Sequence, residues 1–323
     1  CLTVSLPDYR IQPTNPMSTS LLIAQLLNGI QLGLMLFLLA AGLTLIFGIM
    51  DLINLAHGSL YMFGAYFTAA ATQASGSFWL GLLAGALGVA LLGVIVEVGI
   101  MRRLYQRDHL AQVLATFALI LMSNEIVRFI WGAQPMLLNS PASFRGPVTL
   151  PLINSNYPSY RLLLIAIGVV VAVLLFWLVN RTRLGMWIRA GASNREMAMA
   201  MGVPIDRLFT LLFALGAALS ALAGGLTGPL LSVQIGMGEN ILILTFLVIV
   251  IGGIGSIKGA LIASLLVGIV DTAGRILIPL LIRQLALGAV GTNVGGALAA
   301  MLIYVVMAAI LFWKPQGLFP AGS

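Results

Sequence analysis

Long apolar runs, separated by short polar or glycine-rich breaks, follow one another along nearly the whole chain. A bilayer core about 30 Å thick needs about 20 mostly apolar residues for each helical span, and runs of about that length recur. The pattern predicts an all-α integral membrane protein with about eight transmembrane helices. We expect them at residues 20–48, 57–75, 78–101, 111–132, 161–180, 207–232, 241–275 and 287–313.

Two of the apolar regions are interrupted. The stretch 48–66, "GIMDLINLAHGSLYMFGAY", sets polar residues between apolar runs, and 251–268, "IGGIGSIKGALIASLLVG", repeats that layout. Because the 35-residue run 241–275 exceeds one span and contains glycines, it can be a half-helix followed by a full helix. Irregular backbone at membrane depth is tolerated where protein buries it or where it lines a watery cavity.

Paired breaks of this kind mark the substrate path in some transporters, but two short loops at the membrane face would give the same pattern. The sequence leaves both interpretations open. The candidate path residues are Asn28, Asn54, His57, Gly58, Ser59, Gly252, Gly253, Gly255 and Ser256.

The stretch 193–204, "SNREMAMAMGVP", predicts a short helix outside the membrane. Ser193 and Glu196 have the spacing of a capping box, while Gly202 and Pro204 are typical helix terminators. Residues three and four apart share a helix face, so this helix has one apolar strip, formed by Met197, Ala198 and Met201. Such a helix can lie flat on the membrane or dock a cytoplasmic partner, and the small side chains favour docking.

Small residues recur at four-residue spacing in many predicted spans. This spacing lets helix backbones approach closely in lipid, where packing rather than water exclusion drives association. We therefore expect tight helix contacts at Gly29 and Gly33, Gly81 and Gly85, Gly224 and Gly228, and Ala260, Ser264 and Gly268.

The composition leaves no room for a large soluble domain, so any function outside the membrane must be carried out by partner proteins. Of 323 residues, 60% are hydrophobic and 8% charged, against roughly a quarter charged in soluble domains. We divide the chain into a loose N-terminal segment (1–19), a single transmembrane domain (20–315) and a C-terminal tail (316–323).

The net charge of +7 reports orientation rather than nucleic-acid binding, because the basic residues lie in short loops instead of along one face. Arginines concentrate at 102–107 and in the loop 181–207, so the positive-inside rule makes both loops cytoplasmic. Loop 133–160 then lies outside. Counting eight spans from these anchors places both termini outside, although Lys314 argues weakly against this for the C-terminus.

Charged residues within the spans are spaced to pair. Glu125 with Arg128, and Asp271 with Arg275, share helix faces. Glu97 lies about one turn from Arg102 near a helix end, where a carboxylate can reach water. This leaves no unpaired carboxylate for a proton relay, which counts against a proton-driven pump.

The sequence predicts no catalytic residues and no metal site. The only cysteine is Cys1, and there is no GxxxxGK[ST] phosphate loop. An intramembrane hydrolase would depend on His57 and Ser59, but residues two apart on a helix do not face each other and no third group orients the base.

Four ordered motifs resemble those of one family. They are "GLTLIFGIMDLINLAHGSLYMFGAY" (42–66), "RAGASNREMAMAMGVPIDR" (189–207), "VIGGIGSIKGALIASLLVGIVDTAG" (250–274) and "KPQGLF" (314–319). Together they closely resemble the permease subunits of high-affinity branched-chain amino acid ABC importers, specifically the first of the two permease types. The likeness runs from about Leu21 to Phe319.

The resemblance implies a multi-pass subunit of the bacterial inner membrane that binds no cofactor itself, ATP being used by its partners. These partners are a second, unlike permease, two cytoplasmic ATPase subunits and a periplasmic substrate-binding protein, besides membrane lipid; no nucleic acid is implied. It also implies that 193–202 is the coupling helix that contacts an ATPase, through Ser193, Asn194, Glu196, Met197, Ala198, Met201 and Gly202. Asn194 stands where the family often has an acidic residue.

Two alternatives remain at this point. Related ABC permeases carry urea, short amides or other amino acids, so the cargo stays open. A stand-alone channel or secondary carrier is the more distant possibility.

Overall fold

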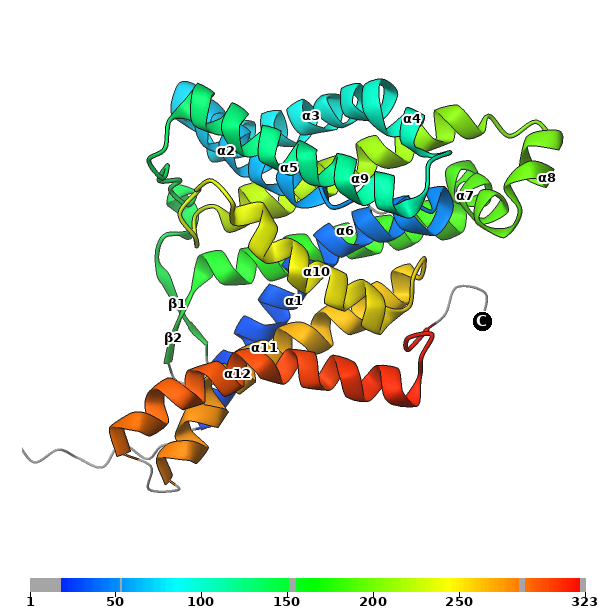
Figure 1. The fold of residues 1–323 in the computed structure, drawn as a ribbon. Helices are drawn as coiled ribbons and strands as arrows, with labels where there is room; N and C mark the ends of the chain where they lie inside the picture. The colour runs from blue at the N-terminus through cyan, green and yellow to red at the C-terminus, as the bar shows by residue number, and fades with distance from the viewer. Residues whose placement is uncertain (1–18, 53, 151–154, 285–287, 320–323) are drawn as a thin grey trace, which may run out of the picture.

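The computed structural model describes residues 19–52, 54–150, 155–284 and 288–319, and it is a bundle of long helices (Figure 1). The predicted N-terminal segment lies almost wholly outside the described residues. The membrane helices are α1 (Thr19–Met50), α2 (His57–Ser75), α3 (Phe78–Val96), α5 (His109–Trp131), α6 (Ser159–Arg181), α9 (Ile205–Thr227), α10 (Met237–Gly252), α11 (Ile257–Gln284) and α12 (Gly288–Trp313). Shorter elements are the π-helical turn η1 (Glu97–Met101), α4 (Arg102–Leu104), η2 (Ala142–Phe144), α7 (Arg183–Ser193) and α8 (Arg195–Ala200).

The prediction of an all-α membrane protein is confirmed. Seven helices in the described part of the chain are long and apolar enough to cross a bilayer. The helix α2 adds 19 residues with the predicted bounds 57–75, while α10 is a shorter apolar helix of 16 residues. The long run 241–275 is therefore two helices, separated by a turn at residues 253–256, as its glycines indicated.

Because the run 241–275 forms two helices instead of one span, the chain ends at the opposite end of the bundle from the one predicted. With α10 and α11 both passing along the bundle, the C-terminal segment returns to the end that carries α7 and α8 (Figure 1). There the backbone N–H of Leu318 donates to the carbonyl of Ile251 at 2.8 Å, and that of Phe319 donates to Gly252 at 3.1 Å. The prediction that the C-terminus and the loop 181–207 lie on opposite sides was therefore wrong, because it counted one crossing too few.

The predicted small-residue stripes pack against each other between α1 and α11. A Cβ added to Gly33 would lie 2.7 Å from the carbonyl oxygen of Ser264, and one added to Gly29 would lie 2.8 Å from the Cα of Ile269. Gly268 faces the same contact from α11. The backbones therefore touch directly, which only side chains of this size permit.

Helix α1 continues this contact along its whole length. In its middle, Gly42 meets Gly216 of α9, and near its end Gly48 lies against Gly255 in the turn between α10 and α11. Most of its side chains after Gly33 are buried. The helix is consequently the central element of the bundle, with α6, α9, α10 and α11 packed around it.

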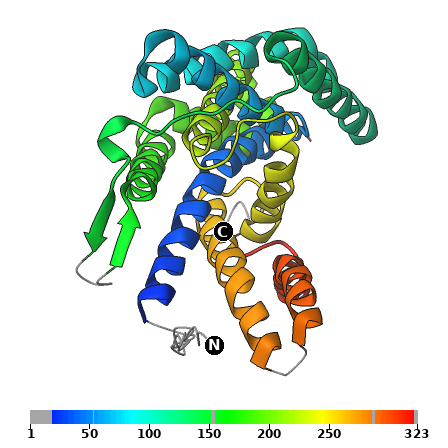
Figure 2. The same ribbon diagram turned by 90° about the vertical axis from the view of Figure 1, so that its left-hand side faces the viewer.

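The loop predicted at residues 133–160 contains a short antiparallel hairpin. Strands β1 (Pro147–Leu150) and β2 (Ser155–Pro158) pair with Val148 opposite Tyr157. A further bridge joins Met136 to Val233 in the loop between α9 and α10. Figure 2 views the molecule from this end, which is opposite to α8.

Replacing Gly33 with alanine should destabilise the bundle, because the new methyl group overlaps backbone atoms of α11 that cannot turn away. Overpacking of this kind costs about 1–3 kcal/mol. The matched control is Gly296→Ala in α12, where an added Cβ meets nothing within 4 Å. The midpoint of thermal unfolding in detergent should fall for Gly33→Ala and stay at or above the wild-type value for the control. Equal midpoints for the two variants would contradict a backbone contact at Gly33.

Candidate functional site

The short helix α8 exists as predicted, but a different residue begins it. Ser193 is the last residue of α7, and Asn194 adopts an extended conformation (φ −155°, ψ 105°) between the two helices. The Asn194 side-chain oxygen accepts a hydrogen bond from the Met197 backbone N–H at 2.9 Å. The predicted hydrogen bond from the Glu196 N–H to Ser193 was therefore wrong. Asparagine caps a helix as well as serine does, and Asn194 lies one residue closer to the start of α8.

The predicted end of α8 is confirmed. Gly202 has a φ of +86°, in the left-handed region. Its N–H donates to the carbonyl of Met199, and the N–H of Val203 donates to the carbonyl of Ala198. This pair of bonds is a Schellman motif, which satisfies the carbonyls that a helix end leaves free. Both ends of α8 are thus capped by residues of its own loop.

The side chains of α8 divide into an inner and an outer set. Ala198 is 4% exposed and packs against the protein, whereas Met197 and Met201 are 60% and 80% exposed. Ala198 is therefore not part of the predicted apolar strip, because adjacent residues of a helix point in different directions. Met197 and Met201 remain one turn apart on an uncovered face, and we call this pair the methionine face. Figure 1 shows α8 at the far end of the molecule.

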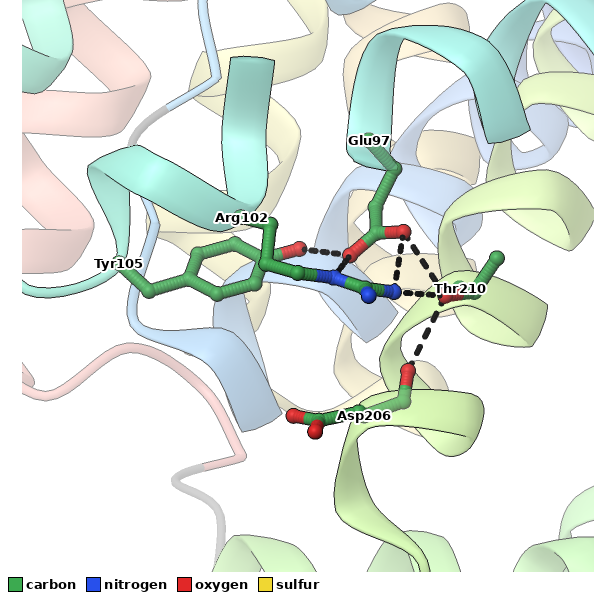
Figure 3. Close-up of polar contacts among 5 residues, drawn as sticks. All are labelled: Glu97, Arg102, Tyr105, Asp206 and Thr210. Carbon is green, nitrogen blue, oxygen red and sulfur yellow. Dashed lines mark hydrogen bonds and ion pairs between the residues drawn. The ribbon is translucent and has the colours of Figure 1, made fainter. Parts of the chain in front are cut away.

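Glu97 is the centre of a buried polar cluster near α8 (Figure 3). It is fully buried, contrary to the prediction that it reaches water. Arg102 pairs with it at 3.2 Å, and the Tyr105 hydroxyl donates to it at 2.9 Å. The Thr210 hydroxyl, on α9, lies 2.8 Å from the other carboxylate oxygen. Three partners together offset the cost of removing this charge from water.

A stack of side chains links that cluster to the first residue of α8. The rings of Tyr105 and Phe209 meet edge to face with centroids 5.3 Å apart. The Arg195 guanidinium lies 4.7 Å from the centroid of the Phe209 ring, within the range of a cation–π contact. Burial, followed by the Glu97 charge, raises the pKa of the Tyr105 phenol, so its hydroxyl stays protonated and keeps donating. The start of α8 is consequently connected to α9 and, through Tyr105, to the end of α3.

The predicted path residues fall at three separate places. At the α8 end, Gly255 and Ser256 line an open cleft together with Ser193 and Phe319. The cleft therefore lies between the loop that carries α8 and the turn that separates α10 from α11. The Ser256 hydroxyl accepts from the Gly259 N–H at 3.1 Å, which caps α11.

Several of the other predicted path residues are packing positions. Gly58 touches Gly238 of α10, and Gly252 touches Gly259 of α11, in each case backbone to backbone. Gly253 has a φ of +98° and lies against the C-terminal segment. His57 is completely buried beside α1. These residues hold the breaks together, and none of them lines the cleft at the α8 end.

Asn54 and Ser59 line a second, mainly apolar pocket between α2, α3 and α5. The Asn54 side chain is 1% exposed, and no described residue gives either of its polar atoms a hydrogen bond. Buried amides without a partner are rare.

Asn28 lies at the opposite end of the bundle, in a cavity between α1, α6, α9 and α10. Its side-chain oxygen accepts from Arg161 at 2.6 Å and from the Tyr157 hydroxyl at 2.9 Å. Sequence reasoning did not connect Arg161 with Asn28. The one available signal was on the α1 side, where Gln25, Asn28 and Gln31 share one face of an otherwise apolar helix; it does not point to Arg161.

The comparisons with known proteins settle the family. Residues 25–312 match the family model described as branched-chain amino acid transport system / permease component. The chain belongs to this family. It is 30% identical over 266 residues to the high-affinity branched-chain amino acid transport system permease protein LivH of Escherichia coli (strain K12), covering 76% of this chain and 84% of LivH.

Two further relatives bear on the cargo. The high-affinity branched-chain amino acid transport system permease protein BraD of Pseudomonas aeruginosa is 30% identical over 77% of this chain and 85% of its own. The fructose import permease protein FrcC of Rhizobium meliloti is 35% identical, but over 34% of each chain. No solved structure matches this chain. The protein is therefore a transport permease subunit, a multi-pass protein of the bacterial inner membrane and the membrane component of an ABC importer.

Replacing Tyr105 with phenylalanine should weaken the Glu97 cluster, because the buried carboxylate loses one of its donors. Hydrogen bonds to charged groups are worth about 1.5–3 kcal/mol, so the midpoint of thermal unfolding should fall. Tyr304→Phe in α12 removes a hydroxyl of the same kind from a half-exposed position and should have no effect. A Tyr105→Phe protein as stable as the Tyr304→Phe control would show that the hydroxyl contributes nothing to the cluster.

Proposed function

We propose that this permease carries branched-chain amino acids inward, driven by two cytoplasmic ATPase subunits that contact α8. The observation that carries the proposal is the geometry of α8: a helix closed at both ends, anchored by Ala198 and Arg195, with its methionine face uncovered. Methionine suits a contact that must repack during a cycle, because its side chain is flexible and polarisable.

The orientation supports contact with the cytoplasm. Ten of the sixteen basic residues lie at the α8 end, namely Arg102, Arg103, Arg107, Arg181, Arg183, Arg189, Arg195, Arg207, Lys258 and Lys314. Cytoplasmic loops carry such an excess. The hairpin end is then extracytoplasmic, where a substrate-binding protein delivers the cargo.

The partners follow from what the chain itself lacks. Its sequence contains no GxxxxGK[ST] phosphate loop, so ATP is bound and hydrolysed by other subunits, and this chain holds no cofactor. A second, unlike permease completes the membrane part of the complex. The names of LivH and BraD support branched-chain amino acids as the cargo.

In the proposed mechanism, a movement of the ATPase subunits is transmitted through α8 to the membrane helices. Closure of the ATPase pair displaces α8, and the stack of Arg195, Phe209 and Tyr105 carries the displacement into α9 and the end of α3. The two permeases then rock between an outward-facing and an inward-facing state, each favoured by a different ATPase state. The cleft between the α8 loop and the α10–α11 turn lies where the inward-facing path would open.

A second cargo class has one observation in its favour. About a third of the chain is similar to the fructose import permease FrcC, whose name gives an uncharged cargo, and this similarity supports the second class. Uptake of labelled leucine, urea and fructose by cells that regain this gene separates these classes. Flux through the purified chain without an ATPase would instead indicate a stand-alone carrier.

Replacing Met197 and Met201 together with alanine should weaken ATPase binding, because the two exposed side chains form the proposed contact. Truncating a central hot-spot side chain of an interface costs about 2 kcal/mol or more. We therefore expect the amount of ATPase recovered with the purified permease, and leucine uptake, to fall about tenfold or more. Met199→Ala is the control, since Met199 is similarly exposed on the other side of α8.

The result against this assignment is full ATPase recovery and uptake in the double variant. Equal losses in the double variant and in Met199→Ala would also count against it, because they would indicate damage to α8 as a whole rather than to one face.

A further inference from the structure

We infer that the cavity beside Asn28 is a binding site for the carboxylate and the aliphatic side chain of the cargo amino acid, with Arg161 as its anion-binding group. The inference rests on the proposed function for the identity of the cargo. The site lies at the hairpin end of the bundle, where Tyr157 of β2 bonds Asn28, and is not one of the two sequence breaks.

The size and shape of the cavity suit a small molecule. Its volume is about 340 Å³, within the range of roughly 300–1,000 Å³ that ligand sites occupy. Buried Tyr61 and Thr227 form its inner wall, and their hydroxyls are hydrogen-bonded to each other. That bond joins α2 to α9 and closes the cavity toward the middle of the bundle.

Arg161 gives the cavity its charge. Among the described residues no acidic side chain pairs with it, in contrast to Arg102, Arg128 and Arg275, each of which has an acidic partner. It is the one charged side chain among the described residues that line the cavity. A cation at the start of a membrane helix, facing a cavity without a counter-ion, attracts an anionic group.

The surrounding polar groups hold Arg161 in place. Asn28 binds one terminal nitrogen of the guanidinium, and Tyr157 donates to the same amide oxygen. The Asn28 amide nitrogen donates in turn to Gln25 at 3.2 Å. Asn28 is therefore fixed on both sides. Arg161 also bonds the Tyr157 hydroxyl, and the guanidinium donors that neither residue engages match the geometry of a carboxylate.

Gln31 and Thr272 add two polar side chains, and the rest of the lining is apolar. Leu32 and Met35 come from α1, Leu230 and Leu231 from the segment after α9, and Ile241 from α10. A cation next to such a surface distinguishes an aliphatic amino acid from fructose, which has no carboxylate to pair with Arg161. The cavity thus combines the two features by which a branched-chain amino acid differs from an uncharged sugar.

Two measurements test the site. In the first, Thr272, which lines the cavity, is replaced with cysteine in a Cys1→Ser background, and the purified chain is labelled with an anionic and a cationic methanethiosulfonate of similar size. The anionic reagent should react on the order of tenfold faster, because a cation in a confined site concentrates anions. Arg161→Gln should abolish that preference and Arg161→Lys should keep it.

In the second measurement, leucine uptake is compared in cells whose own branched-chain uptake has been deleted. Arg161→Gln should lower the maximal uptake rate about tenfold or more, given the usual strength of charge-assisted hydrogen bonds. Arg145→Gln is the control, since Arg145 lies in the loop before α6 and bonds the backbone carbonyl of Ser140, and it does not line this cavity. Size-exclusion profiles establish that each variant is folded.

The outcomes separate the two ideas. If the wild type carries no leucine but shows an Arg161-dependent anion preference, the proposed cargo is wrong and the anion site stands. If the wild type carries leucine and Arg161→Gln behaves like Arg145→Gln, the site is overturned. A folded wild type without any preference between the two reagents also overturns it, whichever way the variants behave.

Discussion

The structure depends on direct backbone contact along α1. Lipid tails are as apolar as leucine side chains, so a membrane bundle gains little from burying apolar surface and is held by close packing instead. Gly29 and Gly33 bring α1 against α11, Gly42 against α9, and Gly48 against the α10–α11 turn. Each contact fixes one neighbour, and together they determine where the cavity and the cleft can lie.

The break after α10 shows how irregular backbone is stabilised near the membrane. A helix end leaves its last carbonyls without partners, which is costly away from water. Here the C-terminal segment supplies N–H donors to Ile251 and Gly252. Gly253 and Gly317 lie backbone to backbone, and both have a positive φ. The motif "KPQGLF" is thus part of the break although it lies some sixty residues further along the chain.

Much of this fold could be predicted from the sequence because apolar length and glycine spacing act locally. The bounds of α2, the division of the run 241–275, the stripe contacts and the left-handed Gly202 all follow from such local rules. The predictions that failed depended on competition between neighbouring residues for one role, or on contacts between residues that are distant in the sequence. Asn194 displaced Ser193 as the cap, and a π-helical turn buried Glu97. That turn, with its i→i+5 bonding, brings Glu97 and Arg102 to the same side, whereas an α-helix would not.

The candidate site was only partly predictable for a similar reason. The break residues do lie at the breaks, yet most of them are packed against neighbouring helices, because a glycine needed for close approach looks the same in sequence as one that lines a path. Asn28 was among the candidates from the sequence, but its hydrogen-bond partner Arg161 is more than one hundred residues away, and no spacing rule connects them.

The continuity of α1 has one further consequence. Its 32 residues contain no break, and Asn28 and Gly48 are separated by about 30 Å at 1.5 Å per residue. An unbroken rod of that length acts as a lever: a tilt of about five degrees at one end shifts the other by about 3 Å. The two faces of the membrane are in this way mechanically joined through a single helix, without a chain of side-chain rearrangements between them.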